Sequence, residues 1–259
     1  MNHVTNLFNY RDLLWMWTLR EVRIRYKQSA IGGLWAILQP LSLMLIFTFV
    51  FSLIARVPSV EVPYPVFSYV ALVPWTFLTT SLSFAVPSLV SNMNLVTKIY
   101  FPREILPIAS VSAAFLDAMI ASLLLFVMMV VYKISLSVTL IWVPLIVLIQ
   151  VLLILGIAFL LSALNVFYRD IRFVIPLATQ LWLYASPVIY PISLVPEQFL
   201  PIYMLNPMAG IIESYRRVIL LGVNPVWSHL GISAAISAVL FVSGYAYFKR
   251  SENLFADLI

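Results

Sequence analysis

Residues that could do chemistry are sparse in this sequence, and the one that stands out is Asp117. It lies inside an apolar segment, where a carboxylate is costly unless it is paired or hydrated, and this makes it a candidate functional group. A proton relay would need more than one such group, and no second charged residue falls within the predicted spans. The sequence favours a protonated or hydrogen-bonded aspartate that holds helices together, with a functional role as the alternative.

Patterns typical of catalysis or metal binding are missing. His3 and His229 have no partners at metal-ligand or triad spacing, and the chain contains no cysteine. The acidic residues outside the spans stand singly, whereas a metal-bound nucleotide sugar would require a cluster. The phosphate-binding pattern G-x-x-x-x-G-K-S/T does not occur. We expect no catalytic site, no metal and no cofactor on this chain, so an energy source must lie elsewhere.

The composition is that of an integral membrane protein. Of 259 residues, 63% are hydrophobic and only 10% are charged, and the mean hydropathy is +1.03, whereas a soluble domain carries about 25% charged residues. The formal net charge of +5 is best interpreted by where the cations lie along the chain, and it does not imply a nucleic-acid partner.

Apolar runs of about 20 residues predict membrane spans, and we expect six in an all-α fold. They cover residues 31–55, 66–90, 105–131, 138–164, 173–190 and 230–248. With the amino terminus in the cytoplasm, only Arg56, Lys133, Arg216 and Arg217 of the 15 lysines and arginines fall on the outer side. This agrees with the positive-inside rule, and it places both termini in the cytoplasm.

The segment before the first span is predicted to be a helix in the membrane interface. An apolar stripe that includes Trp15 and Tyr26 occupies one side, while Arg20, Arg23 and Lys27 recur on another face. Such a helix lies apolar side down, with its basic side toward anionic lipid headgroups or a protein partner. The Gly32–Gly33 pair then lets the chain turn into the bilayer, where Trp35 is an interfacial aromatic.

The connection between spans five and six, residues 191–227, is too long for a turn and too apolar for a solvated loop. Its punctuation by Pro196, Pro207 and Gly222 predicts two short helices, which we place on the outer side as a re-entrant hairpin. Irregular backbone at membrane depth must be satisfied by protein or a water-filled cavity, so the hairpin would border a pathway. The alternative is an amphipathic loop on the membrane surface.

On the inner side, residues 91–107 combine apolar and charged side chains. Tyr100 and Phe101 stand among Lys98, Arg103 and Glu104, and an exposed apolar patch ringed by charge is typical of a docking surface. Aromatic residues make up 14% of the chain, and their faces suit the apolar faces of sugar rings, although lipid-facing belts and core packing use them too. Our first candidates to line a pathway are Trp35, Trp182 and Tyr190.

Four motifs in order carry a resemblance to a known family. They are R-x-R-Y-K-Q-S at Arg23 to Ser29, G-x-x-W-x-x-L-Q-P at Gly32 to Pro40, Lys98 followed by F-P-R-E-I-L-P at Phe101 to Pro107, and N-V-F-Y-R-D-I at Asn165 to Ile171. Together they resemble the membrane subunit of an ABC-2 type exporter, and within that family the permeases that export lipid-linked polysaccharides such as O-antigen, capsule or teichoic acid. The likeness covers nearly the whole chain.

The resemblance implies an organisation and a set of roles. The chain would be a single transmembrane domain, 1–259, with an interface helix in 1–30, five spans in 31–190, an outer gate hairpin in 191–227, and the sixth span with a cytoplasmic tail in 228–259. Residues implied to contact a separate ATPase subunit are Arg20, Arg23, Arg25, Tyr26, Lys27, Asn94, Lys98, Tyr100, Phe101 and Arg103. A cytoplasmic gate or coupling role falls on Tyr168, Arg169 and Asp170, with an ordinary helix-end charge pair as the alternative, and the outer gate would include Pro207, Glu213, Arg216 and Arg217.

The expected assembly is a homodimer in the bacterial cytoplasmic membrane. Two ATPase subunits would bind ATP and magnesium, and a lipid-linked glycan would pass between the two copies, in contact with membrane lipids. An ABC-2 exporter of drugs or lipids remains an alternative within the same fold. A membrane glycosyltransferase would need acidic clusters, and an ion-coupled carrier is poorly supported by Asp117 alone.

Overall fold

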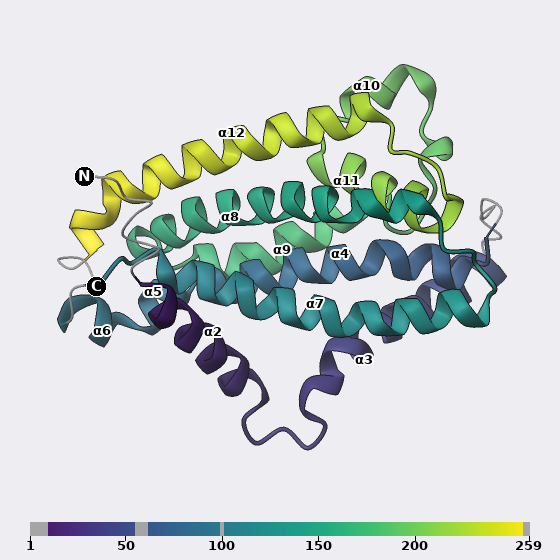
Figure 1. Cartoon of the computed structure of the whole chain (residues 1–259). Coiled ribbons are helices and arrows are strands. Elements are labelled where there is room, and N and C mark those ends of the chain that lie inside the picture. Colours follow the sequence, from purple (N-terminus) through teal and green to yellow (C-terminus); the bar gives the residue numbers. More distant parts are fainter. Residues whose placement is uncertain (1–9, 55–61, 99–100, 256–259) are drawn as a thin grey trace.

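The computed structural model describes residues 10–54, 62–98 and 101–255, and these residues form helices without strands. The long helices run side by side along an elongated bundle (Figure 1). Five stretches are long and apolar enough to cross a membrane: Gly32–Ser52, Tyr64–Ala85, Ile105–Val131, Val138–Phe167 and Trp227–Leu254. They correspond to predicted spans one to four and six, so the all-helical membrane fold is confirmed.

The predicted fifth span differs from the structure. Helix α9 covers Ile171–Tyr184, only 14 residues, which at 1.5 Å per residue rise about 21 Å and fall short of the ~30 Å hydrocarbon core. The chain turns after Tyr184, and Pro187 and Pro191 follow. Apolar composition continues through these turns, and for that reason hydropathy alone predicted a longer helix.

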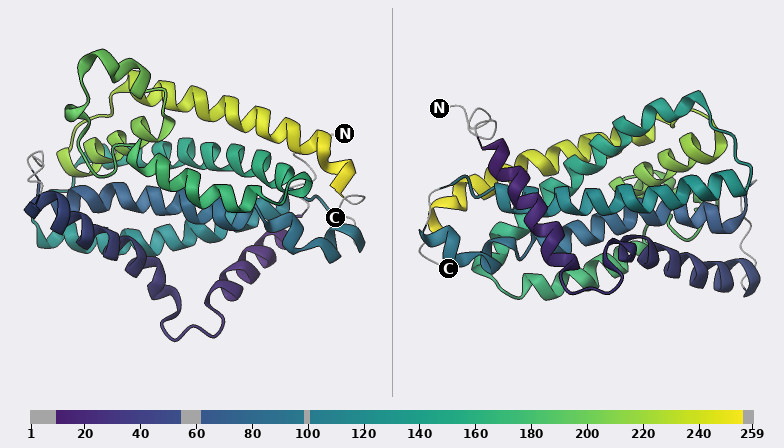
Figure 2. Two further views of the ribbon diagram at one scale, coloured as in Figure 1. Left: turned by 180° about the vertical axis from the view of Figure 1, so that it is seen from behind. Right: turned by 60° about the horizontal axis from the view of Figure 1, so that its bottom comes forward.

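Helix α4 (Tyr64–Ala85) is the centre of the bundle. It starts with Pro65 in its first turn, where a missing N–H is tolerated, and Tyr69, Leu72 and Leu78 are fully buried along it. It packs against α7 (Ile105–Val131), α3 (Trp35–Phe47), α8 (Val143–Phe167), α9 and α11 (Pro207–Arg216). Helices α7 and α8 lie on the face of the bundle seen in Figure 1, and α9 lies on the opposite face (Figure 2).

Helices α8 and α12 (Trp227–Ser251) pack along much of their length. Their backbones touch at two glycines, because a Cβ added at Gly244 would overlap the carbonyl oxygen of Gly156, and one added at Gly156 would lie 2.6 Å from the backbone of Leu240. Small residues that allow such close approach are a common basis of helix association in membranes, where lipid is as apolar as the side chains.

One end of the bundle holds the first turns of α2 (Arg11–Tyr26), the short helices α5 (Ser88–Ser91) and α6 (Met93–Lys98), and the last turns of α12 (Figure 1). These are the segments that the sequence analysis assigned to the cytoplasmic side. A second hydrophobic cluster fills this end, and it includes Phe101, Phe159, Phe248 and Phe255.

Helices α2 and α3 meet at an angle through the turn η1 (Gly32–Leu34), and α3 continues into η2 (Thr48–Ile54). Gly32 has φ +58°, a conformation that glycine adopts without steric cost. The predicted turn at the glycine pair is therefore confirmed. Only Thr18 of α2 is fully buried, and Trp15 is 58% exposed, so much of the predicted apolar stripe is not covered by the bundle.

The opposite end contains the segment that was predicted to hold two short helices. They are α10 (Leu200–Tyr203) and α11, and two short turns, η4 (Ile192–Leu194) and η5 (Glu197–Phe199), precede α10. Helix α11 runs into η6 (Arg217–Leu221), and η3 (Val138–Trp142) leads into α8. Nearly every side chain of α11 is buried, against α12, α4 and α8.

Candidate functional site

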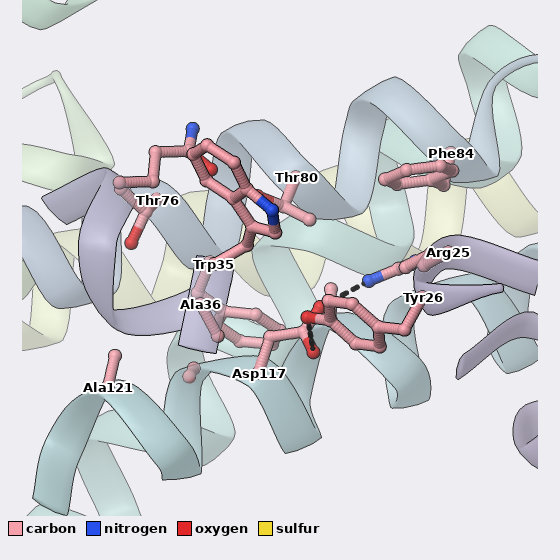
Figure 3. A pocket seen from close by; sticks show the side chains of 13 residues that line it. Arg25, Tyr26, Trp35, Ala36, Thr76, Thr80, Phe84, Asp117 and Ala121 are labelled. Carbon is pink, nitrogen blue, oxygen red and sulfur yellow. Dashed lines mark hydrogen bonds and ion pairs between the residues drawn. The ribbon is translucent and has the colours of Figure 1, made fainter. Parts of the chain in front are cut away.

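Asp117 is paired with a cation that comes from outside the predicted spans. Arg25, in the last turn of α2, donates from Nη1 to Asp117 Oδ2 at 2.6 Å, and from Nη2 to the carbonyl oxygen of Ser110 at 2.9 Å. The hydroxyl of Tyr26 donates to Asp117 Oδ1 at 2.7 Å. Figure 3 shows the side chains of Arg25 and Tyr26 directed at the Asp117 carboxylate. We call Arg25, Tyr26 and Asp117 the α2–α7 cluster.

The cluster is largely shielded from solvent. The side chains of Arg25 and Asp117 are 5% and 14% exposed, and the guanidinium lies 4.0 Å from the ring centroid of Phe84. Burial, and then the hydrogen bond to Asp117, raise the pKa of Tyr26, so its phenol keeps its proton and acts as the donor. Both Asp117 oxygens therefore accept a hydrogen bond from α2.

A pocket of about 190 Å³ opens beside the cluster. Its walls include Trp35 and Gln39 from α3, and Thr76 and Thr80 from α4. Trp35 is 52% exposed. An indole face, an amide and hydroxyls beside a neutralised ion pair suit a polar ligand without net charge, because such groups donate and accept hydrogen bonds.

A larger groove of about 520 Å³ continues from this pocket between α3, α4 and α9. The two share Gln39, Thr76, Thr80 and Phe84. The groove adds further hydroxyl and amide side chains and a set of aromatic rings: Thr79, Ser83, Thr179, Gln180, Phe47, Trp75 and Tyr184. Among the residues that the structure describes, no charged side chain lines it. We call the pocket and this groove together the polar groove.

The three aromatic residues predicted to line a pathway are placed differently. Trp35 borders the pocket. Trp182 packs edge-to-face on Trp75, with ring centroids 5.9 Å apart, and its Nε1 donates to Asn206 Oδ1 at 2.9 Å. The hydroxyl of Tyr190 lies 3.0 Å from that of Tyr203. Trp182 and Tyr190 therefore tie α9 and the following turn to the segment of α10 and α11.

The residues predicted to contact an ATPase divide into two groups. Arg20, Arg23, Lys27, Asn94 and Lys98 are exposed, and Arg20 also donates to Asn92 Oδ1 at 3.0 Å, which ties α2 to the α5–α6 turn.

The others face the protein itself. Arg25 and Tyr26 are directed at Asp117, and Phe101 is 8% exposed within the second cluster. Arg103 donates to the backbone of Glu252, the residue that follows α12. Tyr100 lies outside the described residues. For both groups, contact with an ATPase subunit stays a prediction.

The remaining predicted positions lie at the two ends. Tyr168, Arg169 and Asp170 are exposed between α8 and α9. At the other end Pro207 is buried in the first turn of α11, Glu213 is half-buried, and Arg217 donates to the carbonyl of Asn224 at 3.0 Å.

Arg216, another of the predicted outer-gate residues, is buried, with 3% of its surface exposed. Its guanidinium donates to the carbonyl oxygens of Pro187, Val188 at 2.7 Å and Tyr190 at 3.2 Å, and it lies 3.6 Å from the ring centroid of Phe67. A side chain that was counted as an outer cation thus fastens the turn after α9 to α11.

Sequence reasoning missed two polar networks. Lys249 is 2.8 Å from both Glu104 and Glu252. Gln150 donates to the carbonyl of Pro74 at 2.7 Å and accepts from the Tyr215 hydroxyl at 3.1 Å. The charged connection at 103–104 was a signal for the first network, although nothing in the sequence names its partner. No signal pointed to the second.

Taken together, the described residues define an α-helical multi-pass membrane protein with a polar, aromatic groove along one side of its bundle. A family model described as ABC-2 type transporter matches residues 12–220, and the chain belongs to this family. The resemblance carried by the four motifs is therefore confirmed. The chain is a permease of this family and not an enzyme.

Several relatives align over nearly their whole length. An O-antigen export system permease protein RfbA of Klebsiella pneumoniae is 30% identical over 256 residues, which cover 98% of this chain and 97% of the relative. The protein of that name from Myxococcus xanthus is 30% identical over 260 residues, with 99% and 98% covered. A polysialic acid transport protein KpsM of Escherichia coli is 24% identical over 245 residues, with 91% and 92% covered.

Proposed function

We propose that this chain is the membrane subunit of an ATP-driven exporter that moves a lipid-linked polysaccharide across the bacterial cytoplasmic membrane. The observation that carries the proposal is the polar groove, a continuous surface of hydroxyl, amide and aromatic groups within helices that are otherwise apolar. The relatives, whose names refer to O-antigen export and polysialic acid transport, support the same substrate class.

The chemistry of the groove suits a sugar polymer that must slide. Hydroxyl and amide side chains exchange hydrogen bonds with sugar hydroxyls, and the rings of Trp75 and Tyr184 offer flat surfaces to the apolar faces of sugars. Because the described lining of the part between α3, α4 and α9 contains no charged side chain, no single strong contact there would hold the polymer in place. A drug or lipid exporter in this fold would have less use for the hydroxyl and amide groups of the groove.

A second copy of the chain would close the groove. Helix α9 packs against few neighbours, and a row of large apolar side chains along it is more than half exposed: Phe173, Leu177, Leu181 and Tyr184. A polar groove open to lipid would be unfavourable, whereas two facing copies would enclose it and cover this row. The functional unit we propose is a homodimer.

ATP and magnesium would be bound by a separate ATPase subunit on the cytoplasmic side. The exposed cations of α2 and α6, among them Arg23, Lys27 and Lys98, supply the docking surface, and α2 also contacts the lipid headgroups. A cytoplasmic gate directly before the start of α9 is formed by Tyr168, Arg169 and Asp170. Pro207, Glu213, Arg216 and Arg217 belong to the outer gate.

We place both termini in the cytoplasm of a bacterial cell and count α9 as a sixth, short span. Its missing length would be made up by the turn after Tyr184 and by α10 and α11, which together form the re-entrant hairpin. The burial of α11 against α4, α8 and α12 supports this arrangement, because protein then satisfies the irregular backbone.

Export by groove variants tests this function. The double variant Thr79→Val and Gln180→Leu removes a hydroxyl and an amide from the groove without adding bulk. We expect export of lipid-linked polysaccharide to fall about tenfold or more, equivalent to ~1.4 kcal/mol of lost transition-state stabilisation, in cells that depend on this permease and its ATPase.

The matched control is Ser243→Ala on α12. Ser243 is exposed and donates to the carbonyl of Val239 in its own helix at 2.7 Å, much as Thr79 does to that of Thr76 at 3.2 Å. The control should export normally. Normal export by the groove variant at equal protein level would contradict the proposal, and export of a glycan-free lipid or drug in its place would favour the alternative exporter.

A further inference from the structure

Helix α12 extends along the bundle from the end that holds α5 and α6 to the end that holds α11 (Figure 1). Its 25 residues rise about 37 Å at 1.5 Å per residue. It makes tight contacts at both ends and in the middle, and these contacts suggest a role that neither the motifs nor the family assigns.

At the inner end, α12 is fastened to the connection between α6 and α7. Lys249 Nζ lies 2.8 Å from Glu104 Oε2 and 2.8 Å from Glu252 Oε2. Arg103 donates to the backbone carbonyl of Glu252. Glu104 is only 2% exposed, so its charge depends on Lys249 for compensation, and loss of that partner would leave a buried carboxylate unpaired. We call Arg103, Glu104, Lys249 and Glu252 the inner clamp.

Aromatic packing reinforces the inner clamp. Phe248 lies between Phe159 of α8 and Phe255, with ring centroids 5.3 and 5.4 Å apart. Phe101, from the α6–α7 connection, belongs to the same buried cluster. Close-packed aromatic side chains transmit a displacement because the interior has little free volume to absorb it.

In the middle and at the outer end, glycines allow α12 to lie close to its neighbours. Gly244 rests on Gly156 of α8, as described above. At the outer end Gly210 of α11 rests on α12, since a Cβ added there would overlap the Ser233 hydroxyl and lie 2.8 Å from the carbonyl oxygen of His229. Helix α11 therefore lies in close contact with α12 at this point, and a side chain at position 210 would push the two helices apart.

We infer that α12 is a rigid link which carries movement from the α6–α7 connection to α11, so that docking and closure of the ATPase on the inner side reposition the outer gate. Glu104, Lys249 and Gly210 are positioning residues in this device. The inference rests on the proposed function, because that function places the ATPase at one end of α12 and the gate at the other.

The chain has no cysteine, which allows a direct test by spin labelling. Ser91→Cys on α5 and Arg250→Cys at the end of α12 are both exposed, and labelled chains are diluted with unlabelled ones in the assembled complex so that distances within one protomer are measured. We expect the distance between the labels at positions 91 and 250 to be the same with and without ATP. Its distribution should broaden when Lys249→Met is added. A reference pair, Ser42→Cys and Arg250→Cys, should change with ATP.

Two outcomes separate the inference from the proposed function. If the reference pair moves with ATP and the Ser91 to Arg250 distance moves as well, the rigid link is wrong while the transporter stands. If the complex shows no ATP-dependent movement at the reference pair, the proposed function itself fails. An unchanged distance distribution after Lys249→Met would also overturn the clamp.

The coupling of ATP hydrolysis to export provides the second test. Lys249→Met should lower the glycan exported per ATP hydrolysed about tenfold, with ATPase binding retained, whereas its neighbour Arg250→Met, an exposed cation on the same helix, should have no effect. Because Lys249→Met leaves Glu104 unpaired, the double variant Glu104→Gln and Lys249→Met serves as a folding control, since neutral partners avoid a buried charge. Normal folding with normal export per ATP in the double variant would overturn the inference.

Discussion

Arg25 shows how the place of a side chain changes its role. The neighbouring cations of α2 are exposed, while Arg25 reaches a carboxylate 92 positions away in the sequence. No periodic pattern links two such positions, so the sequence analysis counted Arg25 among docking residues and Asp117 as a charge without a partner. Their pairing attaches α2 to α7.

Removal of one member of this pair should cost stability. Asp117→Asn leaves the buried Arg25 without its counter-charge, and we expect a loss of about 3–5 kcal/mol in the free energy of unfolding, read as a lower midpoint of thermal unfolding in detergent. The double variant Arg25→Gln and Asp117→Asn should recover part of the loss. If Asp117→Asn unfolds like the wild type, the pair does not hold α2.

The same variant separates two transport mechanisms. In an ATP-driven permease, folded Asp117→Asn protein should keep ATP-dependent export, because the carboxylate moves no proton. Loss of export together with a dependence on the proton gradient in the wild type would instead favour the ion-coupled carrier.

Arg216 is a second residue whose neighbours define it. It satisfies three carbonyl groups of the turn after α9, and Arg216→Met would leave them buried without donors at ~1–3 kcal/mol each. We expect faster proteolysis at residues 187–190 and weaker export. Arg217→Met, which changes the adjacent cation that donates to an exposed carbonyl, is the control for protease resistance alone, because Arg217 is itself a proposed gate residue. Equal protease resistance in both variants would be evidence against this role.

At the scale of elements, hydropathy placed most helices well. The limits of α7 agree with the predicted span, and the turn at Gly32 was expected because glycine pairs allow it. Helix α9 was predicted too long, since its apolar composition runs on into turns shaped by Pro187 and Pro191. The location of α11 inside the bundle could not be foreseen, because burial depends on neighbours that the local sequence does not name.

Two glycines of α12 offer a matched test of helix packing. An added Cβ at Gly244 overlaps Gly156, whereas one at Gly231 meets nothing within 4 Å. Gly231→Ala should stabilise the protein by about 0.5–1 kcal/mol through helix propensity, and Gly244→Ala should destabilise it by forcing α8 and α12 apart. Thermal unfolding of the two variants measures both effects. Similar shifts in both would mean that the close approach contributes little.

For the whole molecule, the sequence alone yielded the membrane class and the family. It could not yield the polar groove. The groove needs α3, α4 and α9 to be neighbours, and its lining residues, such as Gln39, Thr79 and Gln180, are separated by long stretches of chain. Each of them looks like an ordinary polar residue in an apolar helix until the fold brings them together.

A second copy should be needed for activity. Leu177→Lys places a charge in the exposed apolar row of α9, where burial against a partner would be costly. We expect the purified permease to shift from dimer to monomer by mass photometry and export to be lost. Leu123→Lys, which changes a side chain 65% exposed on α7, should remain dimeric. A dimer that survives Leu177→Lys would place the interface elsewhere.

The measurement that tests the central claim most directly is photo-crosslinking from the groove in cells that make the polysaccharide. A photoreactive residue is placed at Gln180 inside the groove or at Leu123 on the outside of α7. Glycan should become attached at position 180, only when the ATPase is active, and not at position 123. The absence of glycan at position 180, or equal labelling at both positions, would contradict the account.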